Sequence, residues 1–134
     1  MQFDSAQGMA VTTAVNTGAI STSTTTAGVI IDTQGYNSLT AVLNVGARTD
    51  GTYTLSVEHG DAANLSDTST PDATDLVGTT AGSAVATAQS QKKLGYVGNK
   101  RYVRFNIVST GVTSGATAGA VAILGRPSVG PIAQ

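Results

Sequence analysis

The sequence contains no cysteine and no tryptophan, and it has few charged, aromatic and proline residues. Without cysteine the chain can form no disulfide and no thiolate metal site, and it has no thiol nucleophile. A single histidine leaves no second imidazole for a zinc or iron site. Charged residues make up 11% of the chain and the net charge is -1. Neither a disordered acidic chain nor a general binder of polyanions fits this balance.

Long apolar segments are also missing. No apolar run approaches the roughly 18 residues that a membrane helix requires. The first 15 residues include one acidic residue, Asp4, and no Lys or Arg, which is unlike a secretory signal peptide. We therefore expect a soluble protein.

Small residues dominate what is present. Thr, Ala, Gly and Ser account for 68 of the 134 residues, whereas Leu, Ile, Val and Phe together account for 29. No stretch shows the 3.6-residue apolar spacing of an amphipathic helix. Short alternating segments separated by turn residues instead predict a single all-β domain with a thin core, an antiparallel β-sandwich or jelly roll.

Three segments alternate apolar and polar residues in the way of half-buried strands. These are residues 38–45, residues 52–59 and residues 102–108, in the last of which Val103 and Phe105 are expected to face inward. The first two are joined by a short Gly-containing connection, so we predict that they form a hairpin. Residues 116–125 are apolar on both faces, which favours a strand covered on both sides or docked on a neighbour.

The ends of the chain are interpreted as appendages of this body. Residues 1–26 carry one charge and end in a Thr/Ser tract, which predicts an extended N-terminal arm that orders on a partner. Residues 27–127 are predicted to be the sandwich and to fold without the arm. Residues 128–134 are predicted to be a C-terminal tail.

Residues 60–82 are acidic and irregular, with Leu65, Leu76 and Val77 expected to anchor a surface excursion to the body. The four aspartates of this segment could supply oxygen ligands for Ca²⁺, but their spacing does not match an EF-hand loop. The excursion is expected to stay solvated or to meet a basic surface.

Catalytic residues are scarce. His59 lies between Glu58 and Asp61, but neighbours at a strand end point apart, so an exposed structural histidine is the expected reading. The chain has no nucleophile elbow and no phosphate-binding loop. We expect no enzymatic activity, no cofactor and no metal.

Five of the seven basic residues fall between Lys92 and Arg104, with Tyr96, Tyr102 and Phe105 among them. Such a mixture can serve nucleic-acid binding, but the acidic pI of about 5.5 and the inward position of Phe105 argue against it. A charge-complementary contact between identical or neighbouring protein subunits is favoured.

Three segments carry a resemblance to a known family: VIIDTQGYNSLTAVLNVGARTDGTYTLSVEHGD, GNKRYVRFNIVSTG and GAVAILGRP. Together they resemble the capsid cement, or decoration, proteins of tailed bacteriophages over residues 29–127. The resemblance implies a jelly-roll protein on the outer surface of the virion capsid. It also implies assembly in the host cytoplasm, the major capsid protein as partner, and a homo-oligomer, a dimer or trimer, that bridges neighbouring capsid subunits.

The residues predicted to contact the capsid or another subunit come from the arm, the basic group and the tail. They are Val11, Val15, Ile20, Lys92, Lys93, Lys100, Arg101, Pro127 and Ile132. Two alternatives remain open at this point: a phage tail or fibre component, and a carbohydrate-binding β-sandwich that would use Tyr36 or Tyr96.

Overall fold

The computed structural model describes residues 6–127, which fold into an antiparallel β-sandwich. The strands are β1 (Met9–Ile20), β2 (Thr25–Thr26), β3 (Ile30–Asp32), β4 (Tyr36–Arg48), β5 (Thr52–Gly60), β6 (Leu76–Val77), β7 (Ser90–Tyr96), β8 (Tyr102–Thr110) and β9 (Ala116–Pro127). Three short 3-10 turns accompany them: η1 (Ala6–Gly8), η2 (Ala73–Asp75) and η3 (Ala81–Ser83). In this part of the chain no helix has the length and apolarity to cross a membrane. The predicted all-β sandwich is confirmed.

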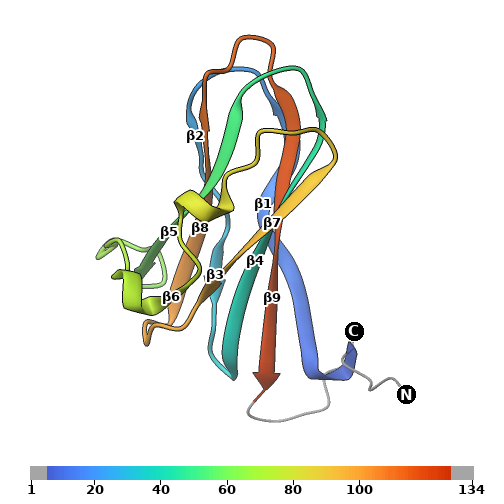
Figure 1. Ribbon diagram of the computed structural model, residues 1–134. Helices are drawn as coiled ribbons and strands as arrows, with labels where there is room; N and C mark the ends of the chain where they lie inside the picture. Colours follow the sequence, from blue (N-terminus) through green and yellow to red (C-terminus); the bar gives the residue numbers. More distant parts are fainter. Residues whose placement is uncertain (1–5, 128–134) are drawn as a thin grey trace.

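Two layers are visible in Figure 1, with β1, β4 and β9 in one and β5 and β8 in the other. The larger sheet has the order β1-β9-β4-β7-β6, and in the smaller sheet β8 lies between β5 on one side and β2 and β3 on the other. The short strands β2 and β3 of the smaller sheet lie between β1 and β4 along the chain, and from β4 onward the chain changes sheet between successive long strands. The first strand, β1, pairs with the last, β9. This nested order is that of a jelly roll, with the outermost strand beside β5 reduced to two isolated bridges, His59 with Ser69 and Tyr53 with Val85.

The predicted hairpin between residues 38–45 and 52–59 is wrong, although both segments are strands. β4 pairs with β7 and β9, whereas β5 pairs with β8 in the opposite sheet. The connection is therefore an arch between the two layers. Alternation shows only that each strand has one buried face, and two such faces can meet across a sandwich as well as lie side by side in one sheet.

The predicted arm is corrected as well. Residues 9–20 are extended, as expected, but they form β1, which pairs with β9 along its length. Ala14 and Val15 are 0% and 1% exposed, and Ile20 is 7% exposed. The apolar spacing is irregular because the register shifts between Thr13 and Val15 and again before Gly18, and such bulges break the two-residue period on which the sequence argument relied.

The core lies between the two sheets and uses small and large side chains against each other. β9 contributes Ala118, Ala120 and Ala122, and the strands facing it across the sandwich contribute larger side chains. Val103, Phe105 and Ile107 of β8, predicted to face inward, are 0% exposed. Asn106, predicted to face outward, is also buried, because its side chain accepts the backbone N–H of Gly28.

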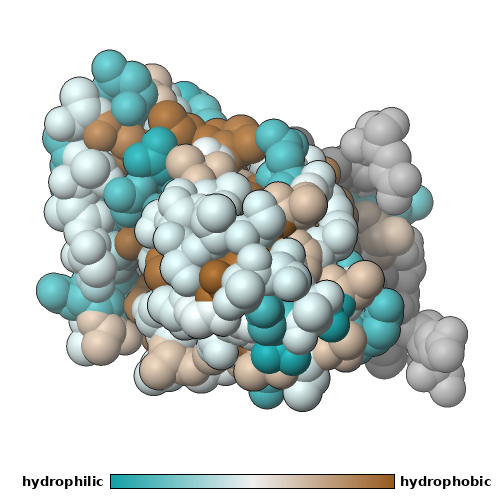
Figure 2. Space-filling view, turned by 90° about the horizontal axis from the view of Figure 1, so that it is seen from above, coloured by the Kyte–Doolittle hydropathy of each residue, from teal (hydrophilic) through white to brown (hydrophobic). Residues whose placement is uncertain are grey.

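Figure 2 shows from above the end of the molecule that carries the β1–β2, β4–β5 and β8–β9 connections. Its surface is mostly pale, because threonine, serine and glycine predominate there. One carboxylate organises this end. Asp50, in the β4–β5 connection, accepts the backbone N–H groups of Thr113, Ser114 and Gly115 in the β8–β9 connection at 2.8 to 3.1 Å. The Asp50 side chain thus links the two loops, together with a backbone hydrogen bond of 2.9 Å from the N–H of Thr49 to the carbonyl of Gly115.

Acid is expected to weaken this fold. Hydrogen bonds from the Ser114, Gly115 and Thr113 amides lower the pKa of Asp50, and the Arg101 hydrogen bond lowers the pKa of Asp32. A carboxyl group whose pKa is lower in the folded state stabilises the fold above its unfolded pKa, near 4, and loses that contribution as the pH falls through the folded value. Urea midpoints should therefore be flat between pH 7 and 5 and fall below pH 4. In Asp50→Asn the fall should be smaller, and an identical profile would contradict the role of Asp50.

Candidate functional site

The outer face of the larger sheet exposes apolar side chains in two rows that run across the strands. One row follows the pairing of Val11 with Ile123, Thr40, Gly95 and Val77, and the next follows Thr13 with Val121, Val42 and Lys93. Paired residues of an antiparallel sheet share a face, and the alternate residues of β9 are buried in the core. We call this surface the valine–lysine face: Val11, Thr13, Thr40, Val42, Val77, Lys93, Val121 and Ile123.

Three of the five apolar side chains of the face are strongly exposed, and Val42 and Ile123 are half-buried. Val11 is 63% exposed, Val77 61% and Val121 41%. Isolated surface valines are common, but a contiguous row of β-branched side chains on one face marks an interaction site in a soluble domain. The sequence predicts that residues 116–125 are covered on both faces or docked on a neighbour. Within this chain only the inner face is covered, because Val121 is left exposed, and docking of the outer face on a neighbour stays a prediction.

One lysine lies on this face. Lys93 is exposed and pairs with Val42, and the two line a shallow hollow of about 350 Å³ together with Gln91 and Lys92. Lys92 is also exposed, but it pairs with the buried Leu43 and therefore lies on the opposite side of β7. Among the described residues neither lysine has an ion-pair partner. On the next row, Gln91 donates to Asn44 at 2.8 Å, which forms a polar margin to the face.

Of the contact residues predicted from the sequence, Val11 and Lys93 are exposed on this face, and Lys92 is exposed on the opposite side of β7. Val15 and Ile20 are corrected, because both are buried in the core and cannot reach a partner. Pro127 ends β9 opposite Tyr36. Ile132 lies outside the described residues, as does the predicted tail.

Lys100 and Arg101 lie away from the face, and each is held by a carboxylate of the same chain. Lys100 donates to Asp61 at 2.7 Å, a hydrogen bond that raises the pKa of Lys100. Arg101 forms two hydrogen bonds of 2.8 Å with Asp32. A partner would have to displace these carboxylates first, so the two residues are poorer contact candidates than their exposure suggests.

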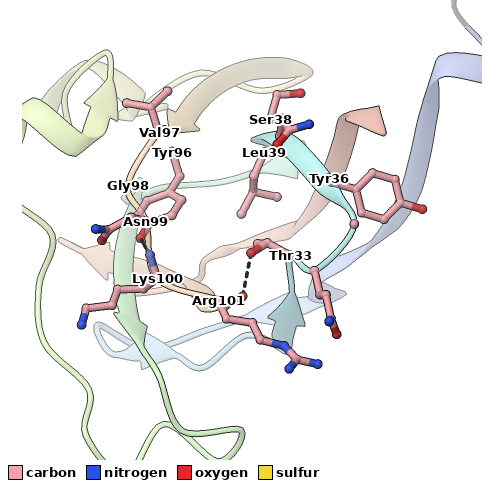
Figure 3. Close-up of a pocket in the computed structure, with 13 residues that line it drawn as sticks. Thr33, Tyr36, Ser38, Leu39, Tyr96, Val97, Gly98, Asn99, Lys100 and Arg101 are labelled. Carbon is pink, nitrogen blue, oxygen red and sulfur yellow. Dashed lines mark hydrogen bonds between the residues drawn. The ribbon is translucent and has the colours of Figure 1, made fainter. Parts of the chain in front are cut away.

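A cleft of about 460 Å³ opens at the end of the sandwich that carries Lys100 and Arg101 (Figure 3). It lies between the β3–β4 and β7–β8 loops, which Thr33 ties together by donating to the carbonyl of Arg101 at 2.7 Å. Of the two tyrosines considered for sugar stacking, Tyr96 is 4% exposed and Tyr36 is half-buried. A sugar platform requires an exposed aromatic face, so no observation favours the carbohydrate-binding alternative.

His59 is buried, contrary to the exposed position expected from the sequence, and its Nδ1 lies 2.8 Å from the Tyr96 hydroxyl. The Tyr96 oxygen accepts the backbone N–H of Lys100 at 3.2 Å, which leaves its own hydrogen to donate to His59. Glu58 points the other way and pairs with Arg104. The residues therefore form a structural link between β5, β7 and the β7–β8 loop.

Loss of the Tyr96 hydroxyl is expected to destabilise the protein. In Tyr96→Phe both His59 Nδ1 and the Lys100 N–H lose a hydrogen-bond partner, which costs about 1–3 kcal/mol of unfolding free energy. Tyr102→Phe is the matched control, because the half-buried Tyr102 ring contacts Arg101 through its face; its effect should stay within about 0.5 kcal/mol. Equal urea midpoints for the two variants would rule out this structural role.

The acidic excursion, residues 60–82, is held by hydrogen bonds within the segment. Asp67 accepts the backbone N–H groups of Asp61 and Ala62. Leu65 is buried as predicted, whereas Val77 is exposed and does not anchor the excursion to the body. Between residues 6 and 127 no three His, Asp or Glu side chains cluster closely enough to hold a metal ion.

Sequence reasoning missed Val42, Val77, Val121 and Ile123 as surface candidates. Residues 116–125 already indicated such a surface, because a strand that is apolar on both faces usually has both of them covered. It was hidden because the face is assembled from five strands, β1, β4, β6, β7 and β9, that span residues 11 to 123.

No family model matches the chain, and no curated protein sequence matches it. Among solved structures, the PBSX exported protein XepA is similar over 100% of this chain, with a TM-score of 0.57 and 16% sequence identity. This chain covers 42% of XepA, less than half of its length. The SPBc2 prophage-derived protein YomS matches 86% of this chain and 92% of its own, with a TM-score of 0.49 and 16% identity. At this identity the likeness to XepA shows the fold alone: this chain is similar to XepA in its antiparallel β-sandwich.

Proposed function

We propose that this chain is a non-enzymatic structural protein of a tailed-phage particle, a cement protein that binds the outside of the capsid and bridges neighbouring capsid subunits. The sequence resemblance over residues 29–127 suggests this role, and XepA, whose fold is similar, is phage-derived. A dimer or trimer of this chain belongs to the same proposal.

The observation that carries the proposal is the valine–lysine face. Polar side chains in place of Val11, Val77 and Val121 would make a monomer that works alone more soluble. All three side chains are instead apolar and exposed on one face. A rigid sheet face also suits an interface in which the partners move little on binding. Many copies, each with a modest contact, can together stabilise a shell.

Binding to phage heads tests the proposal. Heads would be purified from a lysate in which the gene for this chain is disrupted, and the purified protein would then be added. We expect saturable binding and density for the chain on the outer capsid surface in a reconstruction of the particle. Density on the tail would favour the tail or fibre alternative, and no binding to any part of the particle would contradict a structural role.

A further inference from the structure

The charges of the larger sheet are of one sign. Strands β1, β4, β7 and β9 contain no Asp or Glu, and their charged residues are Arg48, Lys92, Lys93 and Arg126. The acidic residues of the described chain lie in the smaller sheet and in the loops: Asp32, Asp50, Glu58, Asp61, Asp67, Asp72 and Asp75. The molecule is nearly neutral overall, but this layer is basic.

We propose that the valine–lysine face binds an acidic protein surface, with an apolar centre against Val11 and Val121 and a carboxylate opposite Lys93. This inference rests on the proposed function, since it describes the partner surface on the particle. Among the residues that the structure describes, Lys93 has no ion-pair partner, so a carboxylate of the partner would meet an unpaired lysine. Charge pairs at the rim of an interface select the partner and speed association, while the apolar centre supplies affinity.

A second copy of this chain is a poorer occupant of the face. If two faces packed together, each lysine would lie against a strand of the other copy, and none of the four long strands has a carboxylate to offer. The acidic excursion is also partly engaged, because Asp61 pairs with Lys100 and Asp67 accepts two backbone N–H groups.

Nucleic acid fits the face less well than protein. Binding of single strands relies on exposed aromatic side chains that stack on bases, together with a track of basic residues. The face carries aliphatic and threonine side chains and no aromatic residue, and its one lysine, Lys93, lies at a border. An apolar centre of valines is instead typical of protein interfaces.

Binding to the heads described above, measured at low and high salt, tests the charge. Lys93→Gln is expected to weaken binding about threefold at low salt and to reduce the salt dependence. The control is Lys92→Gln, which removes the same charge from the preceding exposed residue on the opposite side of β7. This control should bind as the unmodified protein does.

A second pair of substitutions tests the apolar centre. Val11→Thr and Val121→Thr keep β-branched side chains on exposed strand positions, so the fold should be unaffected. Together they should weaken binding about tenfold while leaving the salt dependence intact, because they remove apolar contact and no charge.

The outcomes are distinguishable. If the unmodified protein does not bind heads, the proposed function fails. If it binds and neither Lys93→Gln nor the valine double variant weakens binding, the inference about this face is overturned and the proposed function stands. The inference is equally overturned if a single-stranded DNA oligonucleotide competes for the face. It is also overturned if Lys93→Gln dissociates an oligomer of the free protein in sedimentation, since a second copy would then be the occupant.

Discussion

Deletion of residues 1–20 is expected to abolish folding. The deletion removes β1, and with it three core side chains, Ala14, Val15 and Ile20, and the whole ladder along one side of β9. The loss of apolar burial and of the ladder is comparable with the roughly 5–15 kcal/mol that separates the folded and unfolded states of a small domain. Circular dichroism and amide NMR dispersion of the truncated chain would measure the outcome. A native spectrum would mean that β1 is an appendage after all.

A matched pair of point substitutions in β1 also tests whether this strand is part of the fold. Val15 is 1% exposed and Val11 is 63% exposed, and both are in β1. Val15→Thr buries a hydroxyl group among apolar side chains and should cost about 1–3 kcal/mol of unfolding free energy. Val11→Thr should change it by less than about 0.5 kcal/mol. If β1 were a free arm, the two substitutions would have the same small effect on urea midpoints.

Gly28→Ala is expected to be the most damaging single substitution near the start of the body. A Cβ atom at Gly28 would collide with the backbone carbonyl oxygens of Ala14 in the larger sheet and Phe105 in the smaller one. Neither carbonyl can move without shifting its strand, so we expect a loss of about 3 kcal/mol or more. The expected observation is a large drop in the urea midpoint with an unchanged slope.

Gly18→Ala supplies the control for this substitution. Gly18 lies in β1, and an added Cβ would meet no atom within 4 Å. Replacement there should be neutral or stabilise the protein by up to about 1 kcal/mol, because alanine narrows the unfolded ensemble. Equal losses at both positions would show that the close approach of the two sheets at Gly28 is not what limits the side chain.

Two hydrogen bonds account for the close approach of the two sheets to Gly28. The N–H of Gly28 donates to the side chain of Asn106 at 3.1 Å, and the N–H of the next residue, Val29, donates to the backbone carbonyl of Ala14 at 2.8 Å. The segment that leads into β3 is thus hydrogen-bonded to both sheets. A polar residue in the middle of β8 therefore has a structural function that its outward place in the alternation concealed.

Local patterns determined the strands of this protein. The alternation in β4, β5 and β8 predicts the buried apolar side chains, though not the buried Asn106, because one face of each strand must leave water whatever it packs against. The absence of disulfides and of a two-histidine metal site likewise follows from composition alone, because the chain has no cysteine and one histidine. Composition and the alternation between near neighbours do not depend on how the strands pair, so both can be analysed without the structure.

Only the tertiary structure decided which strands are neighbours and therefore where the exposed surface lies. The sequence alone does not show that β4 and β5 belong to opposite sheets, that β1 completes the larger sheet, or that Lys100 and Arg101 are paired with distant aspartates. The valine–lysine face brings together side chains from residue 11 to residue 123. Pairing between strands so far apart depends on the packing of the whole sandwich, and no local spacing specifies it.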